Sequence, residues 1–445
     1  MRGFRSTLAL LVVLVGLGAY IYFVASKDST TSTQERVFPS LSADAIEEMT
    51  IKNDAGEVTT LKKVDGTWQM TAPVQTRASD LDASGITSAL SGLEVARVVD
   101  ENPADLKEFG LDAPTVEVSF TAKAPNPSGK ILVGGHTATA GNLYARKDGD
   151  KKVVLISEFN LTTFNKSTFD LRDKAIVTFD KEKADGVDVV LAKGGFELKK
   201  ATEWTMVQPI AARADASAAD GLVSAVASLQ MKSVANTTPT ADDLKRFGLD
   251  APAAVVNVHL GTERVSVALG GPAGDDTVYV KAVAKPDVYT VQKAAADDLT
   301  KLADDYRRKD LFDMRAFTAT RIEVASGGKT SVFERVKSGN DGAADTWKRT
   351  APSAVDMDKE KFPAFVATLA DIRALNFVDG KTKTGLDAPA ATITVSFDDG
   401  KRQEKVLLSK VGDSAYASRP DDPGVAAIDT TKYDDALKSI GEFSK

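Results

Sequence analysis

The sequence predicts an α+β protein in which an N-terminal transmembrane helix precedes three tandem repeats of an antiparallel β-sheet module with two helices each. Three observations lead to this prediction. A long stretch near the N-terminus carries no charge, several sequence markers recur with a period near 137 residues, and the runs inside each period alternate polar and apolar residues. The chain of 445 residues is also too long for one ordinary domain and fits three of roughly 100–150 residues.

The first predicted element is a membrane anchor over residues 1–26. No charged side chain occurs between Arg5 and Lys27, which is about 21 residues or about 31 Å of helix. A bilayer core is about 30 Å thick, so residues 4–24 can cross it. Arg2 and Arg5 precede this stretch and place the N-terminus in the cytoplasm. The alternative is a cleaved signal peptide, whose apolar region is normally shorter, at about 7–15 residues.

Three sets of markers define the repeat that follows a polar linker over residues 27–40. The hexapeptide FGLDAP occurs twice and returns a third time as TGLDAP, with its glycines separated by 138 and 137 residues. The three tryptophans of the chain are separated by 136 and 143 residues, and three tyrosines by 135 and 137. The predicted modules therefore span residues 41–180, 181–316 and 317–445.

The elements of one module can be read in order from the first copy. Alternating runs predict three strands, and a proline ends the third of them at Pro73. A helical period follows over residues 78–94, then an extended piece over 95–100 and one helical turn that stops at Gly110. Four further runs predict a meander of strands over residues 115–120, 130–135, 142–147 and 152–157, and residues 160–171 predict a closing helix.

The composition excludes several classes of function. The formal charge is −7 and no run of basic residues occurs, which argues against a nucleic-acid partner. The chain has no cysteine, so disulfides, thiolate nucleophiles and cysteine-based metal sites are excluded. The two histidines, His136 and His259, belong to different copies and form no evident pair. We therefore expect no catalytic residues, no metal and no cofactor, and the protein is expected not to be an enzyme.

The repeats supply a test for chemistry, because a residue that the shared fold requires should recur in all three copies. The repeated aspartates are interpreted as Asx turns that tie the loop before a strand, and the tryptophans as core anchors. An exposed tryptophan platform for a glycan is the alternative for the latter. The expected structural signature consists of Trp68, Pro73, Gly110, Asp112, Pro114, Trp204, Pro209, Gly248, Asp250, Pro252, Trp347, Pro352, Gly385, Asp387 and Pro389.

On the basis of these motifs, the chain resembles a bacterial family built from the repeat called domain of unknown function 4340. The resemblance covers about residues 41–445. Members of that family are similar to single-pass envelope proteins and are often encoded beside ABC-2-type or gliding-motility-type exporters. The third copy departs from the pattern, since Thr384 stands where the others have Phe109 and Phe247. Its packing against the turn is expected to differ.

The resemblance implies an accessory role at a transporter. The expectation is a non-enzymatic binding or scaffold protein, anchored in the bacterial inner membrane with the bulk of the chain in the periplasm. Its expected partners are integral-membrane transporter subunits or envelope proteins. The alternative is an envelope carbohydrate-binding protein or hydrolase, which would use a carboxylate pair or the tryptophan surfaces.

Overall fold

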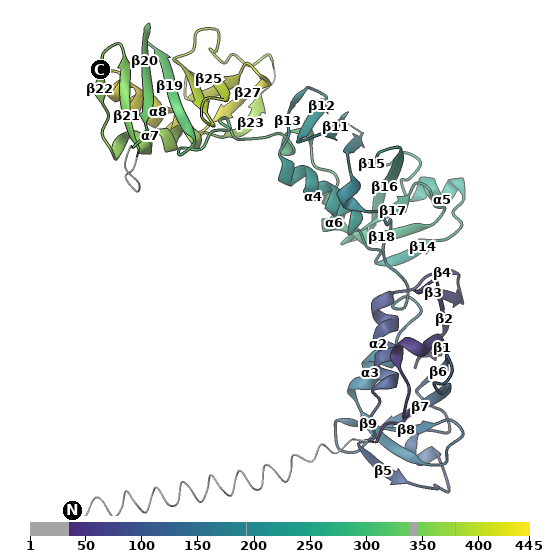
Figure 1. Ribbon diagram of the computed structural model, residues 1–445. Helices are drawn as coiled ribbons and strands as arrows, with labels where there is room; N and C mark the ends of the chain where they lie inside the picture. Colours follow the sequence, from purple (N-terminus) through teal and green to yellow (C-terminus); the bar gives the residue numbers. More distant parts are fainter. Residues whose placement is uncertain (1–34, 193, 339–344, 379) are drawn as a thin grey trace, which may run out of the picture. The chain divides into compact units, whose positions relative to one another are not determined.

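Three antiparallel sheets of nine strands each make up most of the protein (Figure 1). The structure is a computed structural model that describes residues 35–192, 194–338, 345–378 and 380–445. The chain divides into two compact units, Met1–Lys174 with one sheet and Ala175–Lys445 with two. The expectation of three antiparallel modules is confirmed, and the architecture is mostly β.

The membrane span expected at residues 4–24 lies outside the described residues, as do the whole anchor and most of the polar linker. Within the described ranges, no helix is both long enough and apolar enough to cross a bilayer.

The first module has the strand order β4-β3-β2-β1-β6-β7-β8-β9-β5. Its strands are β1 (Ile46–Lys52), β2 (Val58–Val64), β3 (Thr67–Ala72), β4 (Thr76–Arg77), β5 (Arg97–Asp100), β6 (Val116–Ala122), β7 (Gly129–His136), β8 (Asn142–Lys147) and β9 (Val153–Ser157). Its helices are α2 (Asp80–Ser91) and α3 (Phe159–Phe164), with short 3-10 turns η1 (Ala43–Ala45) and η2 (Lys107–Phe109). The predicted meander corresponds to β6 to β9.

The second and third modules repeat this order. The second contains β10 (Gly186–Leu191), β11 (Gly194–Lys200), β12 (Trp204–Gln208), β13 (Ala212–Arg213), β14 (Ser233–Asn236), β15 (Ala254–Leu260), β16 (Glu263–Gly274), β17 (Thr277–Ala282) and β18 (Val288–Gln292). The third contains β19 (Ala319–Ser326), β20 (Lys329–Val336), β21 (Thr346–Ala351), β22 (Val355–Asp356), β23 (Ala374–Val378), β24 (Ala391–Phe397), β25 (Arg402–Val411), β26 (Ser414–Arg419) and β27 (Asp422–Ile428).

The helix content differs between the modules, which corrects the expectation of two helices in each. The second module has three, α4 (Ala216–Ala227), α5 (Ala241–Arg246) and α6 (Lys293–Asp297), with 3-10 turns η3 (Lys181–Lys183) and η4 (Ala303–Asp305). The third has α7 (Lys361–Ala370) and α8 (Thr430–Phe443). The extra helix arises because Thr240 and Asp243 form a reciprocal capping box at the start of α5.

The closing helix of the first module is shorter than predicted, because α3 ends at Phe164. Beyond it, the Ser167 hydroxyl donates to Asp170 at 2.7 Å and accepts from the Asp170 amide at 3.0 Å. Such side-chain bonds offer the backbone an alternative to helix, so the last predicted turns are not helical.

The helix after the third strand crosses one face of each sheet, because it connects one sheet edge to the opposite edge. In the first module α2 runs from β4 at one edge to β5 at the other. The face beneath it is apolar. Met49, Ile51 and Leu61 are at most 1% exposed there, and alternate residues of the same strands face solvent. Burying each such side chain contributes about 1.5–3 kcal/mol to stability.

The two modules of the second unit meet at a charged junction. Arg213 of β13 forms ion pairs with Asp422 of β27 at 2.8 Å and with Asp313 at 2.7 Å. Beside them, the nearly buried Arg419 pairs with Glu404 at 2.9 Å. Glu404 also accepts the backbone N–H groups of Asp313 and Met314. Each of these two arginines therefore has a carboxylate within 3 Å at this junction.

Candidate functional site

All three signature tryptophans lie in the core. Trp68, Trp204 and Trp347 are 3%, 3% and 5% exposed. A cation stacks over each ring, with Lys63, Lys200 and Arg335 at 5.9, 5.3 and 5.2 Å from the ring centroids. A glycan platform requires exposed rings, so these tryptophans do not form one. These repeated cations were not predicted from the sequence. Lys63 and Lys200 precede their tryptophans by nearly the same number of residues, and this spacing is the signal that could have identified them.

The prolines that follow the tryptophans end the third strand of each module, and the peptide bonds that precede them are cis. They are Pro73, Pro209 and Pro352. The second set of signature prolines lies half-buried just before β6, β15 and β24, and consists of Pro114, Pro252 and Pro389.

The signature glycines occupy the left-handed conformation predicted for a helix stop. Gly110, Gly248 and Gly385 have φ of 65°, 68° and 71°. This conformation is costly for other residues, so glycine is required. In the first copy the Gly110 amide donates to the Lys107 carbonyl and closes the short helical turn η2.

The signature aspartates show no Asx-turn hydrogen bond among the described residues. Asp112, Asp250 and Asp387 are exposed. In the part of the chain that the structure describes, no hydrogen bond or ion pair engages their carboxylates. The described contacts therefore give no support to the interpretation of these aspartates as ties, and packing on both sides of them holds the loop.

That packing involves a pair of glycines in the neighbouring strand. In the second module the Gly271 amide donates to the Phe247 carbonyl at 2.8 Å. An added Cβ at Gly270 would lie 2.3 Å from the same oxygen, so only glycine permits the approach. The phenylalanine ring then packs against the repeated tyrosine, with ring centroids 4.4 Å apart for Phe247 and Tyr279. The hexapeptide and the tyrosine marker thus belong to one small cluster.

The third copy loses this cluster, as expected from Thr384. The Ser409 hydroxyl donates to the Thr384 carbonyl at 2.7 Å. In the second copy the equivalent carbonyl, that of Phe247, accepts from the Gly271 amide. A side-chain hydrogen bond therefore replaces the aromatic packing.

The two histidines lie in separate modules. His136 is exposed and its Nδ1 lies 3.3 Å from Glu158. His259 lies half-buried on β15, with Nε2 at 2.6 Å from Asp188. Asp188 also accepts from Asn257, which in turn accepts from Ser266. Ser266 therefore contacts the Asn257 amide and not the His259 imidazole, so these residues do not form a nucleophile–base pair.

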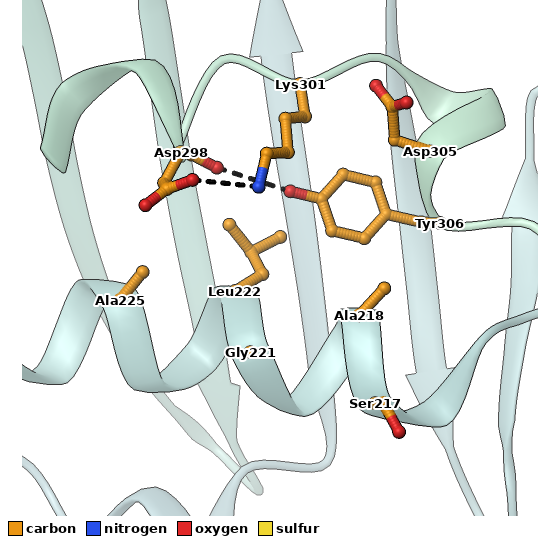
Figure 2. A pocket seen from close by; sticks show the side chains of 9 residues that line it. All are labelled: Ser217, Ala218, Gly221, Leu222, Ala225, Asp298, Lys301, Asp305 and Tyr306. Carbon is orange, nitrogen blue, oxygen red and sulfur yellow. Dashed lines mark hydrogen bonds and ion pairs between the residues drawn. The ribbon is translucent and has the colours of Figure 1, made fainter. Parts of the chain in front are cut away.

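A groove runs along α4 in the second module, and we call it the α4 groove. Its floor consists of Ser217, Ala218, Gly221, Leu222 and Ala225. The segment 298–306 forms its roof and contributes Asp298, Lys301, Asp305 and Tyr306 (Figure 2). This part of the groove has a volume of about 480 Å³.

Two interactions hold the roof together. Lys301 Nζ lies 2.8 Å from the Asp298 carboxylate, and the Tyr306 hydroxyl donates to the Asp298 carbonyl at 3.4 Å (Figure 2). Tyr306 itself is 3% exposed and stacks on Phe196 at 4.7 Å. Burial raises the pKa of Tyr306 to about 12, with the nearby Asp305 and Asp298 charges adding to the shift.

The groove continues past Ser217 into a second hollow of about 410 Å³ beside Trp204. Its acidic residues include Asp215 and Asp220, and both have defined partners. Asp215 caps α4 by accepting the Ala218 amide at 3.0 Å. Asp220 accepts from the Trp204 indole at 2.8 Å and from Lys200 at 3.1 Å.

The electrostatics of this hollow do not suit acid catalysis. Burial opposes ionisation of Asp220, but the hydrogen bonds from Trp204 and Lys200 outweigh it and lower the pKa of its carboxyl group. A general acid in a glycosidase needs the opposite shift. Over the described residues, no group of three or more metal-ligating side chains forms a metal site. The α4 groove is therefore a candidate binding surface.

Comparison with known proteins identifies a family. A family model described as "Domain of unknown function (DUF4340)" matches residues 68–203 and 204–389, which together are more than half of the chain. No curated protein matches. Among solved structures, the crystal structure of a DNA polymerase sliding clamp from Pseudomonas aeruginosa with ligand aligns over 88% of this chain and 92% of that chain. The identity is 7% and the TM-score 0.18, so that alignment carries no argument. The chain belongs to the DUF4340 family, whose function is unknown.

Proposed function

We propose that the chain is a non-enzymatic, membrane-anchored extracytoplasmic binding or scaffold protein that serves as an accessory component of an ABC-type transport or envelope complex. The observation that carries the proposal is the α4 groove, an open surface on one of three repeated modules that the fold itself does not fill. The uncharged stretch between Arg5 and Lys27 supports the anchor.

The carbohydrate alternative has less support. The buried tryptophans cannot stack on a sugar. In the α4 groove, the carboxyl group with a lowered pKa, Asp220, would be ionised and unable to donate a proton at neutral pH.

Purification from membranes tests the proposal. The full chain, tagged at its C-terminus, is extracted in mild detergent, and the proteins recovered with it are quantified against an untagged control. The proposal predicts enrichment of integral-membrane transporter subunits or envelope proteins in constant ratio to the chain. Recovery of the chain alone would count against it.

Anchoring is tested separately by extraction at alkaline pH, which releases peripheral proteins and retains membrane-spanning ones. The chain is expected to stay with the membrane, and to be digested by a protease added from the periplasmic side.

A further inference from the structure

The third module shows how the helix face that floors the α4 groove is covered elsewhere in this chain. There α8 is fourteen residues long and packs on α7, side by side with it (Figure 1). Phe443 at the end of α8 contacts Phe362 and Phe365 of α7, with ring centroids 5.1 and 5.5 Å apart. A continuous helix with an aromatic anchor therefore fits on this face of the module.

In the second module the equivalent segment covers only part of the face. The helix α6 is only five residues long and ends at Asp297, after which the chain forms the roof of the groove. Leu222 follows Trp204 at the same spacing as Phe365 follows Trp347, so the groove lies at the place where α8 meets α7. Leu222 is 2% exposed beneath the roof, whereas Ser217 and Gly221 are exposed, so the open part of this face is the side of α4 that carries these two residues.

The shape of the floor favours a second helix. Ser217, Gly221 and Ala225 follow one another at intervals of four residues and form one row along α4. Small side chains in such a row let another helix approach closely, since the distance between helix axes depends on the side chains at the contact. The groove volume of about 480 Å³ also leaves room for a large apolar side chain.

The charge of the groove favours an occupant whose polar face is basic. Six acidic and three basic side chains line its two parts, a formal balance of −3 (3 − 6). They are Glu203, Asp215, Asp220, Asp298, Asp305 and Asp310, with Lys200, Lys301 and Arg308. Lys301 and Lys200 are already paired with Asp298 and Asp220. An acidic rim of this kind attracts a basic segment and repels an acidic one.

We propose that the α4 groove binds an amphipathic helix of a partner protein, with lysine or arginine on the polar face of that helix and a large apolar side chain seated over Gly221, between α4 and the roof. This inference rests on the proposed function, since it specifies the chemistry of the partner.

A pair of glycines provides a matched test. Gly221 lies within α4, and an added Cβ there would meet no atom within 4 Å. Gly85 has the same place in α2 and equally open surroundings. Replacing either glycine with leucine removes a poor helix former, so neither variant should destabilise the fold. Gly221→Leu places a side chain in the groove, and Gly85→Leu is the control.

The probe is a synthetic lysine–leucine amphipathic helical peptide whose apolar anchor is the photo-crosslinker benzoylphenylalanine. It is titrated onto the full chain, crosslinked, and the attached residues are mapped by mass spectrometry. We expect saturable crosslinks to the groove residues, a yield at least tenfold lower in Gly221→Leu, and no change in Gly85→Leu. The same peptide with glutamate in place of lysine should crosslink at least tenfold less, and salt should weaken binding of the lysine peptide.

Equal yields in the two variants, crosslinks mainly outside the groove, or equal capture of the glutamate peptide would overturn the inference. Membrane purification of the same variants separates it from the proposed function. If Gly221→Leu recovers the partner complex as well as the unmodified chain does, the groove inference fails and the accessory role stands. If the unmodified chain recovers no partner, the accessory role fails, and the peptide result still decides whether the groove binds a basic helix.

Discussion

Arg213 and Asp422 lie 209 positions apart in the chain and are joined by two hydrogen bonds. The Arg213 backbone amide donates to Asp422 Oδ1 at 3.1 Å, and its Nε donates to Oδ2 at 2.8 Å. Both side chains are largely buried, at 20% and 8% exposure. Because these residues belong to different modules, the contact stabilises the arrangement of the second unit and not one sheet alone.

Replacing Arg213 with alanine should therefore destabilise the second unit. The change leaves Asp422 without its cation in a buried setting, and we expect a loss of about 3 kcal/mol in the free energy of unfolding. Urea titration of the full chain measures this loss. Arg77 holds the equivalent place in the first module, where its pairs with Asp80 and Asp173 are more exposed. Arg77→Ala should cost less than about 1 kcal/mol. Equal losses in the free energy of unfolding for the two variants would contradict the conclusion that Arg213 stabilises the contact between the two modules.

Two adjacent glycines should respond differently to the same substitution. An alanine Cβ at Gly270 would lie 2.3 Å from the Phe247 carbonyl oxygen, whereas at Gly271 the nearest atom is 3.7 Å away. Gly270→Ala should cost at least about 2 kcal/mol through overpacking, and Gly271→Ala less than about 1 kcal/mol. The midpoints of thermal unfolding give the comparison. If Gly271→Ala proves the more damaging change, the described docking of the turn is incorrect.

The signature aspartate should prove dispensable for stability. Asp250 is exposed and its carboxylate makes no hydrogen bond or ion pair in the described structure, so Asp250→Ala should change the free energy of unfolding by less than about 0.5 kcal/mol. An aspartate that tied the loop would cost about 1 kcal/mol when replaced, as a lost helix cap does. A loss of that size in a denaturant titration would restore the Asx-turn interpretation.

Stability should fall at high pH because of Tyr306. Its pKa is raised by burial from 10.0 to about 12. Below pH 10 the hydroxyl is protonated in both the folded and the unfolded chain. Between pH 10 and 12 the unfolded chain ionises more readily, so stability is lost as the pH rises through this window. Tyr306→Phe should reduce this loss and remove one late step from the ultraviolet titration of phenolate. An unchanged titration would show that Tyr306 is not the shifted group.

Local features of the fold could be predicted from the sequence. The alternation of residues 115–157 predicts the meander because a strand with one buried face must alternate. The left-handed turn at Gly110 follows from the position of glycine after a helical turn. Both depend on residues close together in the chain, so periodicity and turn chemistry are sufficient.

The α4 groove could not be predicted, because it depends on the path of the chain after β18. The closing segments of the three modules have similar positions in the repeat, yet α6 has five residues and α8 has fourteen. The partner of the repeated tyrosine was missed for a similar reason. Phe247 and Tyr279 are brought together by the close approach of Gly270 to the hexapeptide, which is a tertiary contact.

The central claim is that a membrane or envelope protein binds the second module at the α4 groove. Photo-crosslinking in intact cells tests it most directly, with benzoylphenylalanine incorporated at Ser217 on the groove and, as a control, at the equivalent exposed Leu81 of α2. The account predicts that Ser217 yields a crosslinked integral-membrane or envelope protein, identified by mass spectrometry, and that Leu81 does not. Equal crosslinking from both positions, or none from Ser217, would contradict it.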